Sequence, residues 1–234
     1  FISQHIVQNY KFEELEKLTM IHRGIDLELF NRQRIRIDKV HEYISNWYLP
    51  ADKKIILLPG RITSWKRHNL LIKALCLIDR NDYLVIMLGD SKSHPKYVAS
   101  LNKKISDNNL QEKIQIHDNV RDIENIYHLS DFILSTSSRP EPFGRVISEA
   151  AAMGKIVIAT NHGGAAEQIK DKKTGFLITP DSAQELAEKI ELVLDMKKKQ
   201  KQEMEENAIT RVEKYFSLEK MQKATIKLYK ELLS

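Results

Sequence analysis

Two cations, Arg61 and Lys66, stand five residues apart in the polar segment that follows the apolar run at 55–58. A guanidinium presents a planar pair of donors to phosphate oxygens, and an ammonium presents a compact charge. Together the two side chains could balance the charge of a diphosphate without a metal ion. Two solvated surface cations are an equally good interpretation when this loop is considered alone.

Two carboxylates, Glu141 and Glu149, are separated by seven residues after the apolar run at 132–134. Pro142 and Gly144 open the intervening helix, and free amides at a helix N-terminus can bind an anion. Glu149 falls about two turns into that helix, among apolar residues, where a carboxylate needs hydrogen-bond partners such as ribose hydroxyls. Glu141, on the loop itself, would face whatever lies beyond the phosphates. The alternative is a loop carboxylate beside a structural, buried one.

A third polar segment, 160–167, contains the glycine pair Gly163 and Gly164 after the apolar run at 156–159. Paired glycines permit a sharp turn or a close approach of the backbone to a ligand. Glu167, in the first turn of the next helix, complements the helix dipole. A structural role and a ligand-facing role fit this segment equally well.

The elements that must position these side chains alternate between apolar strands and amphipathic helices. Strands are predicted at 55–58, 83–88, 114–116, 132–134, 156–159 and 175–178, with helices at 67–80, 95–109, 121–130, 144–153 and 163–170. This pattern predicts an α/β fold, a Rossmann-like doubly wound parallel sheet of about six strands. If the strand order is 3-2-1-4-5-6, ligands bind between the first and fourth strands. The cation loop and the carboxylate loop would meet there.

The flanking regions follow a different pattern. Residues 182–196, 199–215 and 218–233 are predicted to form consecutive amphipathic helices. Before residue 54 we expect a short helix at 3–10, a strand at 18–22 and a polar stretch up to Trp47.

Composition limits the class of protein. The 234 residues, 42% hydrophobic and 29% charged, fit one domain with appended helices. No apolar run approaches the roughly 18 residues that cross a bilayer, and no signal peptide is recognisable. The net charge of +5 suits several anionic partners, but no nucleic-acid-binding motif is present. The single cysteine, Cys76, excludes an intramolecular disulfide and is expected to pack in the core.

The polar segments resemble the group 1 family of retaining glycosyltransferases, whose GT-B fold has two Rossmann-like domains that face each other. The resemblance is carried by Gly60-Arg61 with Lys66, by the run from Arg139 to Ala150 (RPEPFGRVISEA), by the run from Met153 to Thr160 (MGKIVIAT), and by Gly163-Gly164 with Glu167. The stretch 21–30 resembles the interdomain segment of the family. The sequence of residues 139–149 is most similar to that of enzymes that build lipopolysaccharide core sugars.

The resemblance implies a role for each candidate site residue. Arg61 and Lys66 match the positions that hold the donor diphosphate. Glu149 matches the glutamate that binds ribose, and Glu141 the glutamate at the transferred sugar. Val120 would hold the nucleobase through its backbone. The full donor-binding set is Gly60, Arg61, Lys66, Val120, Glu141, Phe143, Gly144, Arg145 and Glu149, of which Arg61, Lys66 and Glu141 are the candidate catalytic residues.

The implied reaction moves a hexose from a nucleotide-sugar, such as a UDP- or GDP-hexose, to a glycan or lipid-linked acceptor in lipopolysaccharide or other cell-envelope glycan synthesis. Arg61, Lys66 and the helix N-terminus would stabilise the leaving diphosphate. The sequence has no Asp-x-Asp pair, so we expect no metal requirement. No other cofactor and no nucleic-acid partner are expected. The resemblance places the protein in the bacterial cytoplasm, with at most peripheral contact with the inner membrane face.

The resemblance also divides the chain. It implies an interdomain segment at 1–50, a nucleotide-sugar-binding domain at 51–197, and C-terminal helices at 198–234 that would pack across to an N-terminal acceptor domain. Because that domain is missing here, we expect a fragment, a protein whose N-terminal half is a separate polypeptide, or the product of a decayed gene. The competing hypotheses are a non-catalytic nucleotide-sugar-binding module and, more remotely, a sugar-nucleotide epimerase.

Two positions depart from the family pattern. The family usually has glycine after the phosphate-binding lysine, where this chain has Arg67, and often has glycine at the position of Asp118. Either departure would indicate a shifted loop or relaxed selection on activity.

Overall fold

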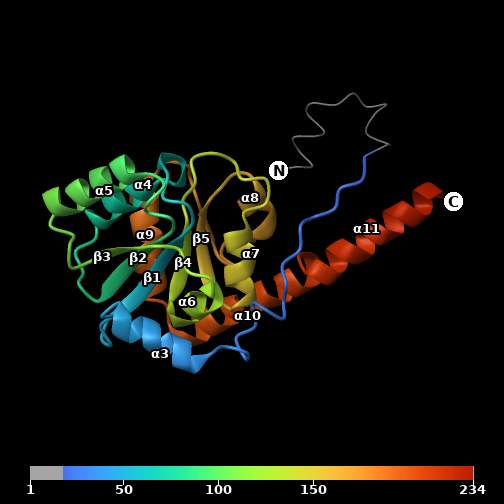
Figure 1. The fold of residues 1–234 in the computed structure, drawn as a ribbon, viewed down its shortest axis with the longest axis horizontal. Coiled ribbons are helices and arrows are strands. Elements are labelled where there is room, and N and C mark those ends of the chain that lie inside the picture. Colours follow the sequence, from blue (N-terminus) through green and yellow to red (C-terminus); the bar gives the residue numbers. More distant parts are fainter. Residues whose placement is uncertain (1–17, 234) are drawn as a thin grey trace.

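The computed structural model describes residues 18–233, and a six-stranded parallel sheet lies at their centre (Figure 1). The strands are β1 (Lys54–Pro59), β2 (Tyr83–Leu88), β3 (Ile114–His117), β4 (Phe132–Ser135), β5 (Ile156–Thr160) and β6 (Phe176–Ile178). They are arranged in the order β3-β2-β1-β4-β5-β6. The predicted fold class and the reversal between the first and fourth strands are therefore confirmed.

Helices cover both faces of the sheet (Figure 1). One face carries α4 (His68–Leu75), α5 (Pro95–Asp107) and α9 (Ala183–Leu194). The other carries α3 (Ile37–Asn46), α6 (Ile123–Leu129), α7 (Arg145–Ala152), α8 (Gly164–Gln168) and α10 (Lys198–Tyr215). Because successive side chains of a strand point to opposite faces, Ile56 and Leu58 of β1 enter the first core and Ile55 and Leu57 the second.

The last two helices differ in how they are packed. α10 buries Ala208 and Val212 against the second face of the sheet, and its Met204 reaches the first core. In contrast, α11 (Leu218–Leu233) extends away from the sheet, and none of its residues is buried (Figure 1). Packing of α11 against an acceptor domain stays a prediction. No helix between residues 18 and 233 has the length and apolar character needed to cross a bilayer.

Three expectations from the sequence are wrong. The polar stretch before Trp47 contains α3, a mostly polar helix on which only Val40 is fully buried. Residues 18–22 form no strand; the nearest pairing is a bridge between Ile25 and Ser217. Cys76 is exposed rather than in the core, since α4 ends at Leu75 and the next residue falls outside its buried face. The helix expected at 3–10 lies outside the described residues.

Candidate functional site

The loops that follow β1 and β4 line one cleft of about 770 Å³ at the carboxyl ends of these adjacent strands. Its lining residues are Arg23, Gly60, Arg61, Trp65, Lys66, Glu141, Pro142, Phe143, Gly144, Arg145, Val146 and Glu149. Every residue of the predicted donor-binding set is among them except Val120, which is half-buried against the second core. The cleft brings together predicted cations and carboxylates that are far apart in the sequence, such as Arg61 and Glu149, which are 88 positions apart.

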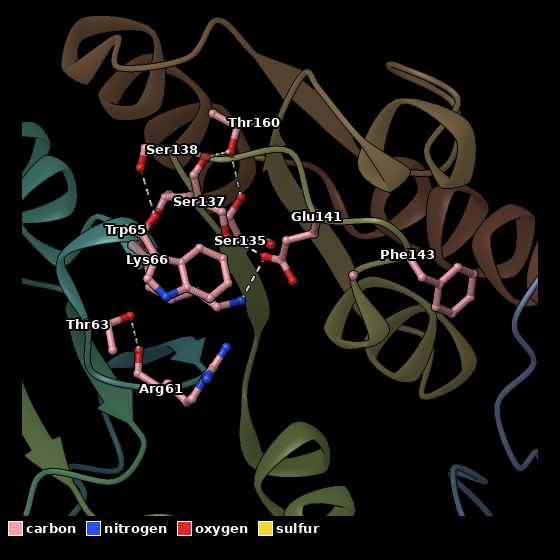
Figure 2. Close-up of polar contacts among 12 residues, drawn as sticks. Arg61, Thr63, Trp65, Lys66, Ser135, Ser137, Ser138, Glu141, Phe143 and Thr160 are labelled. Carbon is pink, nitrogen blue, oxygen red and sulfur yellow. Dashed lines mark hydrogen bonds and ion pairs between the residues drawn. The ribbon is translucent and has the colours of Figure 1, made fainter. Parts of the chain in front are cut away.

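Lys66 and Glu141 form an ion pair in this cleft. The Lys66 Nζ lies 2.7 Å from the Glu141 Oε1 (Figure 2), and the two side chains are only 11% and 22% exposed. The Ser137 hydroxyl donates to the same carboxylate oxygen. Since a partly buried pair is screened less than a surface pair, Glu141 holds the lysine firmly across the cleft.

Trp65 lies beside both cations of the β1 loop. The Arg61 guanidinium carbon is 5.5 Å from the centre of the indole ring, and the Lys66 Nζ is 4.7 Å from it. Two hydrogen bonds from the loop that follows β4 hold the backbone of the loop that follows β1. The Ser138 amide donates to the Trp65 carbonyl at 2.7 Å, and the Thr136 hydroxyl donates to the Lys66 carbonyl at 3.0 Å. The two loops therefore form one connected unit (Figure 2).

Glu149 lies in α7, with each carboxylate oxygen in contact with a different partner. Its Oε1 is 2.9 Å from the Arg145 Nη2, and its Oε2 accepts a hydrogen bond from the Tyr127 hydroxyl at 3.0 Å. Glu149 is 8% exposed. Gly144, with φ of 77°, caps the N-terminus of α7 in a conformation that glycine adopts easily.

The charge of the cleft suits an anion. Four cations (Arg23, Arg61, Lys66 and Arg145) line it together with two carboxylates (Glu141 and Glu149), which gives a net charge of +2. The carboxylates are paired with Lys66 and Arg145. Among residues 18–233, no carboxylate lies within ion-pair distance of Arg23 or Arg61. Two uncompensated guanidinium groups match the two charges of an esterified diphosphate.

The glycine pair holds the Glu141 loop in place. A side chain on Gly163 would lie 2.6 Å from the Glu141 carbonyl oxygen, and one on Gly164 would lie 2.2 Å from that of Phe143. In addition, the Gly164 amide donates to the Glu141 carbonyl at 2.7 Å. Of the two roles left open by the sequence, these contacts support the structural one.

Phe143 contributes backbone rather than side chain to the cleft. Its ring points away from Lys66 and Glu141 (Figure 2) and packs edge-on against Phe216, with 5.8 Å between ring centres. The Phe143 side chain is buried. This anchor keeps the segment before α7 close to the second core.

The two departures from the family pattern have local explanations. Arg67 has φ of 59° and ψ of 38°, the left-handed conformation that favours glycine, and its guanidinium forms an ion pair of 2.6 Å with Asp181. Asp118 accepts hydrogen bonds from the Ser91 amide at 3.0 Å and from its hydroxyl at 2.6 Å. Asp118 thus joins the loops that follow β2 and β3.

Replacing Arg67 with glycine is expected to stabilise the protein by about 1 kcal/mol. A left-handed non-glycine residue costs about 1–2 kcal/mol, whereas the exposed ion pair with Asp181 contributes between about 0 and 1 kcal/mol. Urea unfolding measures the difference. The exposed helical position Lys73 is the control, because Lys73→Gly should destabilise by about 1 kcal/mol. Destabilisation by Arg67→Gly would show that the side-chain contacts outweigh the backbone strain.

Four residues of the site were not singled out from the sequence. Trp65 and Ser137 stand inside the two polar loops, so their position was a usable signal. Arg23 precedes the sheet by 31 residues, and Tyr127 lies on a different helix from Glu149. For these two, no local pattern indicates the contact.

Comparisons with known proteins point to one family. The family model described as "Glycosyl transferases group 1" matches residues 40–211. The protein YtcC of Bacillus subtilis is 30% identical over 189 residues, which cover 76% of this chain and 45% of the relative. The lipopolysaccharide 1,2-N-acetylglucosaminetransferase of Salmonella typhimurium is 30% identical over 138 residues, covering 55% of this chain and 35% of the relative.

Two solved structures share the fold. A glycosyltransferase from Rickettsia africae has a TM-score of 0.95 and 38% identity, covering all of this chain and 62% of its own. HepE from Anabaena, in complex with UDP-glucose, has a TM-score of 0.82 and 26% identity over 91% of this chain and 57% of its own. The chain spans about half the length of the curated relatives it matches.

Proposed function

The chain belongs to the group 1 glycosyl transferases, and from this premise we propose that it is the donor-binding half of a retaining hexosyltransferase. The observation that carries the proposal is the single cleft in which Arg61, Lys66, Glu141 and Glu149 lie together with a net positive charge. The donor is a nucleotide-sugar such as a UDP- or GDP-hexose. HepE, which shares the fold, was solved with UDP-glucose.

The proposed placement of the donor follows the chemistry of the lining residues. The diphosphate lies between Arg61, Lys66 and the N-terminus of α7, where cations and free amides attract phosphate oxygens. The ribose lies against Glu149 and the sugar against Glu141. Val120 lies outside the lining of the cleft, so its proposed backbone contact with the nucleobase rests on the family resemblance.

In the proposed reaction, the bond between the anomeric carbon and the diphosphate oxygen breaks, and the diphosphate leaves with the electron pair. An acceptor hydroxyl attacks the anomeric carbon on the same face, and its proton passes to the departing diphosphate oxygen. Arg61, Lys66 and the α7 N-terminus stabilise the charge that develops on the leaving group. Lys66 must exchange Glu141 for phosphate, because the two side chains are paired in this structure.

The acceptor is proposed to be a glycan or a lipid-linked sugar, bound by a domain that precedes this one. Envelope glycan synthesis, including lipopolysaccharide synthesis, is the proposed setting. The Salmonella relative and the sequence of residues 139–149 support it. Such a protein would work in the cytoplasm or at the inner membrane face.

Isothermal titration with UDP, GDP and UDP-glucose tests the proposal. We expect at least one of them to bind with a dissociation constant below 1 mM, that is, about −4 kcal/mol or better. No heat of binding for any of the three at millimolar concentration would contradict a donor site.

A non-catalytic nucleotide-sugar-binding module is the second candidate, because the cationic cleft would bind a nucleotide-sugar whether or not transfer follows. It predicts donor binding without transfer when the N-terminal half is added as a separate polypeptide. The proposed enzyme predicts that sugar transfer appears in this mixture. Conversion of the donor sugar without any acceptor would instead indicate an epimerase.

A further inference from the structure

Tyr127 is a fully buried tyrosine whose hydroxyl is directed at the cleft carboxylate Glu149. The side chain lies on α6, is 0% exposed, and packs edge-on against Phe30 with 6.1 Å between ring centres. Its hydroxyl donates to the Glu149 Oε2 at 3.0 Å. A tyrosine enclosed in this way cannot turn its hydroxyl elsewhere without disturbing the second core.

The two oxygens of Glu149 differ in the exposure of their partners. Oε2 is held by Tyr127, which does not line the cleft. Oε1 is held by Arg145, which does line the cleft and whose side chain is 65% exposed. A ligand can therefore replace Arg145 at Oε1, but it cannot replace Tyr127 at Oε2.

The state of the tyrosine supports this difference. Burial, and then the neighbouring charge of Glu149, raise the pKa of Tyr127 well above its ordinary range. The phenol therefore stays neutral and remains a hydrogen-bond donor. A carboxylate with one permanent donor keeps its second oxygen as an acceptor for a hydroxyl.

We propose that Tyr127 is a positioning residue for ribose recognition. It fixes Glu149 through Oε2, so that Oε1 faces the cleft and accepts a hydrogen bond from a ribose hydroxyl in place of Arg145. The inference rests on the proposed function, because it requires a nucleotide in this cleft. It adds to that function the residue that sets the preference for ribose.

The test compares UDP with 2′,3′-dideoxy-UDP, which lacks both ribose hydroxyls, in binding titrations with Tyr127→Phe. The unaltered chain should prefer UDP, and Tyr127→Phe should lower this preference about five-fold, the typical effect of one hydrogen bond. Tyr83→Phe is the matched control. The Tyr83 hydroxyl is also buried, but among the described residues it has no hydrogen-bond partner, so its loss should not change the preference.

A purely structural role for Tyr127 would weaken both nucleotides equally, and that result would overturn the inference, as would an unchanged preference. Thermal unfolding shows whether the variant folds. The Glu149→Gln variant gives a second test. Adding Tyr127→Phe to this variant should not lower the preference for UDP over 2′,3′-dideoxy-UDP any further. Equal binding of both nucleotides by the unaltered chain would sink the inference and leave the proposed function standing, whereas binding of neither would sink both.

Discussion

Replacing Lys66 with alanine is expected to weaken UDP binding by about ten- to one hundred-fold. A hydrogen bond to a charged group contributes about 1.5–3 kcal/mol, and Lys66 is the buried cation of the cleft, held between Trp65 and Glu141. The loss should concern only the diphosphate. Titration with UDP and with uridine separates the contribution of the diphosphate from that of the nucleoside. Since uridine lacks the phosphates, it should bind the variant as it binds the unaltered chain.

The control for this prediction is Lys73→Ala. Lys73 is an exposed cation on α4, seven residues further along, and its removal changes the net charge by the same amount. If Lys73→Ala weakens UDP as strongly as Lys66→Ala, the effect comes from general electrostatics rather than from a phosphate contact in the cleft.

The ion pair between Lys66 and Glu141 adds a prediction of opposite sign for the carboxylate partner. Because Glu141 competes with phosphate for the Lys66 Nζ, Glu141→Gln should strengthen UDP binding even while it lowers sugar transfer. Weaker UDP binding by this variant would mean that Glu141 positions the lysine for the phosphates instead of competing with them.

The fold could be predicted because its signals are local. Apolar runs such as 83–88 are buried along their whole length as β2, so composition alone indicates a central parallel strand. α3 escaped prediction although Ile37, Val40 and Ile44 recur at helical spacing, because most of its ten residues are polar and the stretch resembles a loop in composition. The apolar run continues past the end of α4 at Leu75, so the sequence did not indicate that Cys76 lies at the surface.

The candidate site could be predicted only where its residues follow the ends of strands. Arg61, Lys66 and Glu141 belong to loops that a doubly wound sheet must bring together. Tyr127 reaches Glu149 from another helix, and this contact depends on how α6 packs beside α7. Helix packing of this kind leaves no mark in the spacing of the two residues, so the sequence identified Glu149 as a candidate without the residue that donates to it.

The Gly164→Ala substitution is expected to destabilise the protein by about 1–3 kcal/mol, the usual cost of overpacking, and to weaken UDP-glucose binding more than ten-fold. A Cβ on Gly164 would lie 2.2 Å from the Phe143 carbonyl oxygen and 2.7 Å from the Phe143 Cα. These are backbone atoms, which cannot turn aside as a side chain can. The segment from Glu141 to Phe143 must therefore shift, and with it the Glu141 carboxylate, which is proposed to face the sugar.

Gly154→Ala separates loss of stability from displacement of the site. Gly154 has φ of 66°, so alanine is strained there, but its Cβ would meet only the side chains of Ile209 and Arg32, away from the cleft. Thermal unfolding should show both variants to be less stable, while titration should show weaker UDP-glucose binding for Gly164→Ala alone. Equal binding by the two variants would mean that the loop bearing Glu141 tolerates displacement, and the contact between the glycine pair and that loop would then serve stability only.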